Sequence, residues 1–294
     1  DKLDNSELDN LLALALHKSK NYIYKHPDKI LSRSSIQAFN KLLNKKLDNQ
    51  PMAYLAGSKE FFGLKFLVNK NVPVPRPDSE VLVEQALEYL DKKNNLNILD
   101  IGTGSGVVAM IVASRAKSHI DAIEIDKNSC HEAQENFRNS DFNDRLNIIN
   151  EDFNTFRKKE SNGYDMIISN PPFFSNDLLP NNTSRLKSRH TIILSHDDIL
   201  LGSSYMLKEK GRLCVVIPKS AEPTFVNTAS NYGFNVVRKQ YIIPKSGKMA
   251  NRVNLEFILG STAKIDLETI TLRDEKNNYS EQYKRYLGDF LINI

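Results

Sequence analysis

From residue 97 onward, short apolar runs alternate with amphipathic helical patterns, and this rhythm constrains the fold more than any other feature of the chain. The runs that predict strands are 98–101, 119–124, 146–150, 165–169 and 212–217. Strands separated by helices are joined by crossovers, so they lie parallel in one sheet. Two further runs, 235–242 and 252–259, have no helix between them and predict a terminal antiparallel hairpin. We therefore expect an α/β fold with a seven-stranded, mostly parallel sheet.

The chain before residue 58 has a different pattern. Apolar residues recur at helical spacing over 8–16, behind a candidate cap at Ser6, and over 36–47, behind Ser34 and Ser35. We expect a small helical domain over 1–57.

Between this helical domain and the sheet, alternating apolar residues from Phe62 to Val68 predict a hairpin. Three prolines between 73 and 77 then predict a stiff extended connector. A helix capped by Asp78 or Ser79 follows. We assign the hairpin and connector to 58–90, the catalytic domain to 91–260, and a tail that wraps onto it to 261–294.

Composition excludes several classes of protein. The mean hydropathy is −0.44, and no run approaches the roughly 18 to 20 apolar residues of a membrane span. The two cysteines, Cys130 and Cys214, lie far apart and outside any Cys-x-x-Cys pattern. We expect a soluble cytoplasmic monomer with no membrane contact, no disulfide and no metal site.

The net charge of +4 is mild, but its distribution is uneven. No acidic residue occurs between 223 and 255, a stretch that contains Arg238, Lys239, Lys245, Lys248 and Arg252. A solvated face and a phosphate-contacting face both fit this local basic region.

A glycine-rich turn follows the first predicted strand of the sheet. Asp100 precedes Gly102-Thr103-Gly104-Ser105-Gly106, and a helix begins directly afterwards. Such a turn lets backbone approach a ligand closely and directs a helix N-terminus at it, which favours a nucleotide-like ligand. Glycine at every second position is not the dinucleotide pattern, which argues against NAD.

Two carboxylates stand after the next two strands. Glu124 can accept hydrogen bonds from both hydroxyls of a ribose, and Asp152 can accept one from an adenine amino group. Phe153 could lie on the adenine ring. Ordinary surface charge is the alternative interpretation for both carboxylates.

The most specific motif is Asn170-Pro171-Pro172-Phe173-Phe174, at the end of the fourth strand. The Asn170 side-chain oxygen and the Pro171 carbonyl can accept both hydrogens of a planar NH2 group, and Phe173 can stack on it. The alternative is a rigid loop followed by core aromatics. The motif therefore predicts a clamp for an amide or an aromatic amine.

Several polar residues follow this clamp. His190 and His196 are candidate bases, but we interpret both as polar contacts or helix caps. Arg185, Lys187 and Arg189 form a basic loop that suits phosphate and an acidic protein surface equally.

With these motifs the chain resembles the class I methyltransferases that use S-adenosylmethionine and carry an Asn-Pro-Pro-Tyr/Phe motif, which implies a Rossmann-like fold. Residues 1 to about 115 resemble the HemK/PrmC family, which methylates a glutamine amide of peptide chain release factors. That resemblance is carried by the helical domain and by the segments 51–57, 60–64 and 75–80.

The rest of the chain resembles a different group of methyltransferases. Residues from about 120 to the end are similar to the YfiC-type enzymes, which methylate N6 of an adenine in a tRNA. Here the carrying segments are 170–174, 188–190, Pro218, 252–253 and 273–275.

The resemblance implies roles for individual residues. Gly102, Gly104 and Gly106 would hold the methionine part of the cofactor, and Asp100 would help place the turn or the amino group. Thr103 and Asn170 would also contact the cofactor. Glu124 would hold the ribose, and Asp152 with Phe153 the adenine. Asn170, Pro171, Pro172 and Phe173 would form the catalytic clamp, and the acceptor would meet Phe62, Arg76, Phe173, Phe174 and Arg189.

We therefore expect an S-adenosylmethionine-dependent N-methyltransferase. The first choice of acceptor is a release-factor glutamine, because the N-terminal domain resembles the docking domain of that family. The alternative acceptor is adenine N6 of tRNA. A small-molecule amine and a non-catalytic binding module are the remaining hypotheses.

Overall fold

The computed structural model describes residues 3–68, 77–91, 93–159, 163–171 and 194–287. The chain divides into two compact units. One comprises residues 1–60 and 67–74, and the other comprises residues 61–66 and 75–294. Each unit is described by itself below.

The first unit is helical. It contains α1 (Asn5–Leu16), α2 (Lys20–Lys25), α3 (Arg33–Leu47) and α4 (Met52–Ala56). α1 packs on α3, with Leu11 fully buried and Lys46 paired with Glu7 at 2.7 Å. The expected helical region is confirmed, although its helices start earlier than we predicted. The caps are Asp4 and Ser32, whose side chains accept from backbone N–H groups three residues on, in place of Ser6 and Ser34 or Ser35.

A two-stranded hairpin follows, formed by β1 (Ser58–Phe61) and β2 (Leu64–Leu67). Phe62 and Gly63 make its turn with φ values of +54° and +69°. This left-handed pair is the geometry that two-residue hairpin turns require. The Phe62 side chain is buried, with its ring centroid 5.5 Å from that of Phe61.

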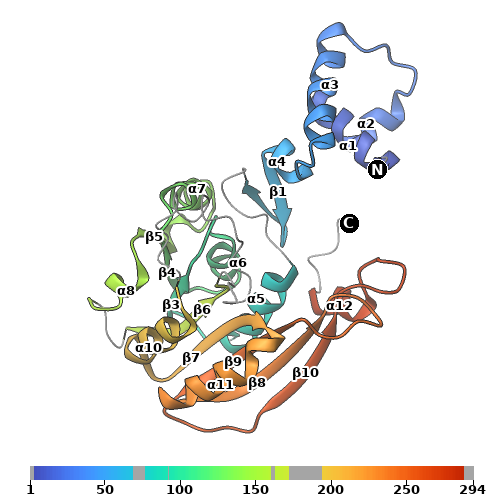
Figure 1. Ribbon diagram of the computed structural model, residues 1–294. Coiled ribbons are helices and arrows are strands. Elements are labelled where there is room, and N and C mark those ends of the chain that lie inside the picture. Colours follow the sequence, from blue (N-terminus) through green and yellow to red (C-terminus); the bar gives the residue numbers. More distant parts are fainter. Residues whose placement is uncertain (1–2, 69–76, 92, 160–162, 172–193, 288–294) are drawn as a thin grey trace, which may run out of the picture. The chain divides into compact units, whose positions relative to one another are not determined.

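The second unit is built on an eight-stranded sheet (Figure 1). Its strands are β3 (Asn97–Ile101), β4 (His119–Glu124), β5 (Leu146–Asn150), β6 (Tyr164–Ser169), β7 (Leu207–Pro218), β8 (Phe234–Ile243), β9 (Arg252–Leu259) and β10 (Asp266–Thr271). The order across the sheet is β10-β8-β9-β7-β6-β3-β4-β5, and β9 alone runs antiparallel to its neighbours in this sheet. All seven predicted strands are present, so the predicted α/β class is confirmed.

The prediction of seven strands was one short. β10 lies in the segment interpreted as a tail and pairs in parallel with the outer edge of β8. The same segment forms α12 (Glu281–Leu287), whose Tyr283 is fully buried. The C-terminal region therefore extends the sheet.

Helices pack against this sheet. They are α5 (Pro77–Leu90), α6 (Val107–Arg115), α7 (Lys127–Arg138), α8 (Phe153–Phe156), α10 (His196–Met206) and α11 (Glu222–Asn231), with short 3-10 turns at Asn143–Arg145 and Lys219–Ala221. α5 contacts both α6 and α12, while α8, α10 and α11 share one apolar core cluster with the central strands. α6 is apolar around most of its surface and almost entirely buried, as a helix between a sheet and other helices must be.

Within the described ranges, no helix is long and apolar enough to cross a membrane. The same ranges contain no group of three or more His, Cys, Asp or Glu side chains placed to hold a metal ion. Cys130 and Cys214 are both free thiols.

Candidate active site

The glycine-rich turn lies at the carboxyl end of β3, where the chain passes into α6. Gly102, Gly104 and Gly106 have φ values of +72°, +60° and +83°, a left-handed region that costs other residues about 1–2 kcal/mol. The N–H groups of Gly102 and Thr103 donate to the carbonyl of Ile123 in β4, at 2.9 and 3.1 Å. The turn is thus fixed to the neighbouring strand.

Gly106 has a second reason to be glycine. A Cβ at this position would lie 2.4 Å from Cε1 of Phe137 in α7. Its carbonyl also accepts the N–H of Met110, which starts the hydrogen bonding of α6. Glycine therefore allows α6 and α7 to pack closely behind the turn.

Asp100 is a buried carboxyl group inside the turn. Its Oδ2 accepts from the Thr103 hydroxyl at 2.5 Å, which explains why threonine stands between the first two glycines. Burial, with a smaller contribution from the Glu124 charge, raises the pKa of Asp100 to about 7, although the hydrogen bonds from Thr103 and the Ala109 backbone lower it. Among the described residues, no cationic side chain pairs with this carboxyl group. The arrangement suits a ligand that brings its own positive charge.

Glu124 ends β4 and faces the turn. Its Oε2 accepts the N–H of Gly104 at 3.0 Å, and its Oε1 accepts the N–H of Asp126 at 2.9 Å. A carboxylate offers about four acceptor positions, so about two remain for a pair of hydroxyl groups. Asn150, at the end of β5, donates from Nδ2 to the Glu124 carbonyl at 2.8 Å. The predicted ribose carboxylate is therefore held in place from both sides.

Asp152 and Phe153 follow β5. Asp152 caps α8, since its Oδ1 accepts the N–H of Thr155 at 3.0 Å. The Phe153 ring is buried, and it comes so close to Gly202 in α10 that a Cβ there would lie 2.5 Å from it. Both residues thus have structural roles. Adenine binding by Asp152 remains a prediction, whereas the Phe153 ring is occupied in core packing.

Asn170 directly follows β6 and is joined to α5 by a hydrogen bond. The preceding Ser169 is tied to β3 by a hydrogen bond from its hydroxyl to the Ile101 carbonyl at 2.9 Å. Asn170 then donates from Nδ2 to the Ser79 hydroxyl at 2.8 Å. This bond uses the amide nitrogen and leaves Oδ1 of Asn170 as an acceptor for a substrate N–H group.

Ser79 is a site residue that sequence reasoning missed. We expected Asp78 or Ser79 to cap a helix, but α5 begins at Pro77, so Ser79 lies inside the first turn. Its position in the Pro-Arg-Pro-Asp-Ser-Glu segment was visible in the sequence. Its contact with a residue far along the chain was not.

The remaining predicted site residues are not brought to this edge by any described contact. Phe62 lies in the hairpin turn, and His196 begins α10 directly after the capping residue Ser195. The half-buried His196 ring packs on Phe225 at 5.1 Å, and burial lowers the pKa of the imidazole. Five predicted residues lie outside the described residues: Arg76, Pro172, Phe173, Phe174 and Arg189. The candidates Arg185, Lys187 and His190 do so too.

The strand order explains why the described groups converge. β3 lies between β4 and β6, and the chain fills the sheet in opposite directions from this point (Figure 1). Open parallel sheets bind ligands at the carboxyl ends of the strands at such a switch point. The glycine turn, Glu124 and Asn170 all follow carboxyl ends of these three strands.

Two family models match the chain. The model of the methyltransferase small domain matches residues 78–239. The model of the PrmC N-terminal domain matches residues 4–57, which are the helices of the first unit.

Curated relatives match over two thirds of the chain. The tRNA1(Val) (adenine(37)-N6)-methyltransferase of Parabacteroides distasonis is 32% identical over 197 residues, covering 67% of this chain and 83% of the relative. The enzymes of the same name from Proteus mirabilis and Cytophaga hutchinsonii are 30% and 34% identical over similar lengths. They cover 66% and 67% of this chain, and 79% and 83% of the relatives.

Solved structures share the fold. A predicted O-methyltransferase from Agrobacterium tumefaciens aligns with a TM-score of 0.57 at 18% identity, covering 72% of this chain and 96% of that one. P. horikoshii TYW2 in complex with MeSAdo aligns with a TM-score of 0.51 at 16% identity, covering 69% and 71%. At these identities the likeness concerns the fold alone.

The site fits S-adenosylmethionine on its own chemistry. The cofactor carries a cationic sulfur and an ammonium group, and Asp100 is a buried carboxyl group without a cationic partner among the described residues. Glu124 has acceptor positions left for ribose hydroxyls. With the match over residues 78–239 and the relatives above, the chain belongs to the methyltransferase small domain family and is an S-adenosylmethionine-dependent N-methyltransferase.

Proposed function

We propose that the protein methylates N6 of an adenine in tRNA, in the cytoplasm. The observation that carries this proposal is the similarity to tRNA1(Val) (adenine(37)-N6)-methyltransferases over two thirds of the chain. This reverses the order of our two expectations, because the release-factor glutamine was the first choice and the adenine its alternative. The relatives named here support tRNA as the partner and give the release factor no support.

The geometry of Asn170 suits an exocyclic amine. Its amide nitrogen is held by Ser79, so Oδ1 faces outward as an acceptor. By accepting one N–H of the amine, Oδ1 fixes the plane of the NH2 group and the direction of the nitrogen lone pair. Correct positioning of two reactants can supply roughly 7–11 kcal/mol of the barrier reduction.

When bound, S-adenosylmethionine supplies an electrophilic methyl group on a positively charged sulfur. Gly102, Gly104 and Glu124 would hold the cofactor, which would supply the methyl group that the adenine nitrogen accepts. The nitrogen then loses one proton to solvent. Asn170 orients the nitrogen in this scheme and does not need to act as a base.

A second candidate function keeps the release-factor glutamine as the acceptor. The match of residues 4–57 to the PrmC N-terminal domain favours it. The same clamp accepts a planar amide NH2, so the chemistry at Asn170 does not separate the two acceptors.

Radiolabelled methyl transfer in parallel reactions tests the proposal. The purified protein is given unmodified total tRNA in one reaction and purified release factor in the other, and Asn170→Ala serves as the control for contaminating enzymes. We expect label in tRNA, recovered after digestion as N6-methyladenosine, and none with Asn170→Ala. Label in the release factor and none in tRNA would overturn the proposal in favour of the second candidate.

A further inference from the structure

Two loops stand beside the active site at the same edge of the sheet. β8 ends at Ile243 and β9 begins at Arg252, opposite Pro218 at the carboxyl end of β7. The 244–251 loop therefore lies at the edge of the sheet that holds the carboxyl end of β6, where Asn170 is located. β10 ends at Thr271, paired with Ile243, so the 272–280 loop follows at that edge too.

The two loops are joined through their backbones. Ser246 donates its N–H to the Arg273 carbonyl at 2.8 Å, and Leu272 donates to the Ile243 carbonyl at 2.9 Å. The 272–280 loop is closed on itself by a bridge between Arg273 and Tyr279. Together they form one surface, which we call the β8–β10 loop surface.

Three lysines of this surface have no carboxylate partner among the described residues. Lys248 and Lys276 are exposed, Lys245 is half-buried, and none of them takes part in a described ion pair or side-chain hydrogen bond. With Arg273 the surface holds four cationic side chains against two carboxylates, Asp274 and Glu275. Asp274 is engaged by the N–H of Asn278 at 2.8 Å.

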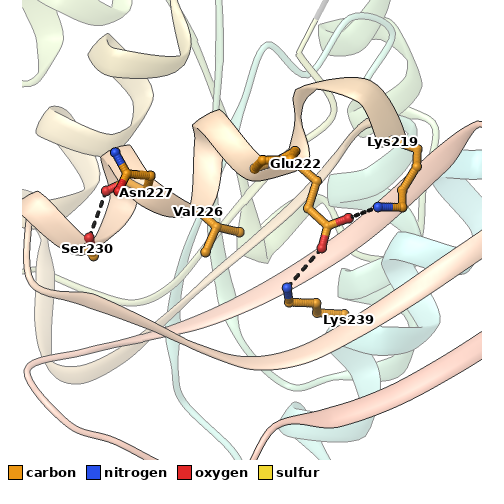
Figure 2. Close-up of a pocket in the computed structure, with 7 residues that line it drawn as sticks. Lys219, Glu222, Val226, Asn227, Ser230 and Lys239 are labelled. Carbon is orange, nitrogen blue, oxygen red and sulfur yellow. Dashed lines mark hydrogen bonds and ion pairs between the residues drawn. The ribbon is translucent and has the colours of Figure 1, made fainter.

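Neighbouring lysines behave differently. Figure 2 shows the pocket between α11 and β8, where Lys219 and Lys239 both point at Glu222. Lys239 pairs with Glu222 at 2.9 Å, and Lys219 pairs with its other oxygen. Arg238 likewise pairs with Glu88. These cations serve the fold, whereas the loop lysines serve no described internal contact.

The distance from the β8–β10 loop surface to Asn170 suits contact with phosphates near an adenine bound at Asn170. β9, β8 and β10 lie two, three and four strand spacings from β6, which is about 10, 14 and 19 Å at roughly 4.8 Å per spacing. Phosphates within a few nucleotides of the acceptor adenine fall within that reach. Unpaired lysines at that range are the groups that neutralise a nucleic acid backbone.

We infer that the β8–β10 loop surface binds the phosphate backbone of the RNA acceptor next to the adenine held by Asn170, with Lys245, Lys248 and Lys276 as the contacts. The inference rests on the proposed function, since it needs an RNA acceptor. The inference also assigns the basic residues of 223–255, for which a solvated face and a phosphate-contacting face both fitted the sequence. Arg238 and Lys239 belong to internal ion pairs, and Lys245 and Lys248 face the acceptor.

The test compares two double variants with equal change in charge. K245Q/K248Q removes two lysines from the surface, and K210Q/K264Q removes two exposed lysines from the opposite edge of the same sheet. The dissociation constant for unmodified tRNA is measured by filter binding over a range of salt concentrations, and the affinity for S-adenosylmethionine by calorimetry. A further measurement is the KM for tRNA in methyl transfer.

We expect K245Q/K248Q to reduce the slope of log affinity against log salt by about 2, since each phosphate contact contributes about 0.9. When the salt concentration rises fourfold, the factor by which the wild-type affinity for tRNA falls should therefore be about ten times larger than the factor for K245Q/K248Q. KM for tRNA should rise while the affinity for S-adenosylmethionine stays unchanged. K210Q/K264Q should match the wild type in every measurement.

Equal slopes for the two double variants would overturn the inference. The inference would also be overturned if K245Q/K248Q bound an acidic protein acceptor more weakly than the wild type does and kept the wild-type affinity for tRNA. Either result is distinct from failure of the proposed function, which would show as absence of methyl transfer to any tRNA by the wild-type protein.

Discussion

Ser79 accepts a hydrogen bond from the side-chain amide of Asn170 at 2.8 Å, across 91 positions of the chain. Ser79 is buried in the first turn of α5, and Asn170 follows the last residue of β6. An asparagine amide can rotate to present either its oxygen or its nitrogen to a substrate. In the structure the nitrogen is the atom bonded to Ser79, which leaves the oxygen for the substrate, so we expect Ser79 to be a positioning residue for the acceptor.

Ser79→Ala should lower kcat for methyl transfer by about 5- to 30-fold, which corresponds to the loss of about 1–2 kcal/mol of orientation. Affinity for S-adenosylmethionine should not change, because Ser79 makes no described contact with the glycine turn or Glu124. Steady-state kinetics and calorimetry measure the two effects.

Ser79→Thr supplies the control, since it restores the hydroxyl group. We expect it to recover most of the wild-type kcat. If Ser79→Ala and Ser79→Thr had the same kcat, the effect would come from packing of α5 and the positioning role would be wrong.

Glu124→Ala should weaken binding of S-adenosylmethionine by about 1–3 kcal/mol, because charge-assisted hydrogen bonds to the ribose are lost. The carboxylate also holds the N–H groups of Gly104 and Asp126, so the alanine variant frees two backbone donors at once. Glu124→Gln keeps an acceptor oxygen and should lose less affinity. Calorimetry that finds all three proteins equal in affinity would contradict the ribose role.

Much of the fold could be predicted because central strands such as β3, β6 and β9 are buried on both faces. Such strands read as continuous apolar runs, and each predicted run falls within a strand of the sheet or agrees with it in position. β10 escaped because it is an edge strand in which Ile270 is the one buried residue. The start of β7 escaped because Lys208, Glu209 and Lys210 interrupt its pattern.

The candidate site, like the fold, has features that the sequence predicts and features that it does not. The position of Gly102, Glu124 and Asn170 at one edge of the sheet could be predicted, because each lies at a strand end and the carboxyl ends of parallel strands meet at one edge. Their binding roles stay predictions. The partners of these residues depend on contacts between distant segments. Ser79 looked like a helix cap, and Phe153 looked available to a ligand until its close approach to Gly202 placed it in the core.

Asp100 should make cofactor binding depend on pH. Its pKa of about 7 in the free protein means that the carboxyl group keeps its proton below that pH. A cationic cofactor favours the carboxylate, so binding must release the proton, and affinity should rise as the pH approaches about 7 and then level off. Calorimetry in buffers of different ionisation enthalpy measures the released proton directly.

Asp100→Asn is the matched control, because it cannot titrate. Its affinity for S-adenosylmethionine should be weaker and independent of pH over the same range. A wild-type affinity as flat as that of Asp100→Asn would show that Asp100 only supports the turn through Thr103.

The same carboxyl group should affect stability in the opposite sense. Between the ordinary pKa of 3.8 and the raised value of about 7, the folded cofactor-free protein binds a proton that the unfolded chain has lost. The free energy of unfolding should therefore decrease as pH rises through this window. The difference in melting temperature between the wild type and Asp100→Asn, measured from about pH 4 to about pH 7, isolates this effect. A difference that stays constant across the window would contradict it.

Gly106→Ala should destabilise the catalytic unit by about 2–5 kcal/mol. The left-handed backbone contributes about 1–2 kcal/mol, and the collision of Cβ with Phe137 adds about 1–3 kcal/mol of overpacking.

Gly260→Ala is the matched control, because Gly260 has a φ of +66° but open space where its Cβ would lie. Thermal unfolding should therefore show a larger decrease in melting temperature for Gly106→Ala than for Gly260→Ala. Since displacement of Phe137 also moves α7 away from the glycine turn, Gly106→Ala should weaken S-adenosylmethionine binding while Gly260→Ala leaves it unchanged. Equal melting temperatures for the two variants would show that Phe137 yields to the new methyl group and that backbone conformation alone requires glycine at position 106.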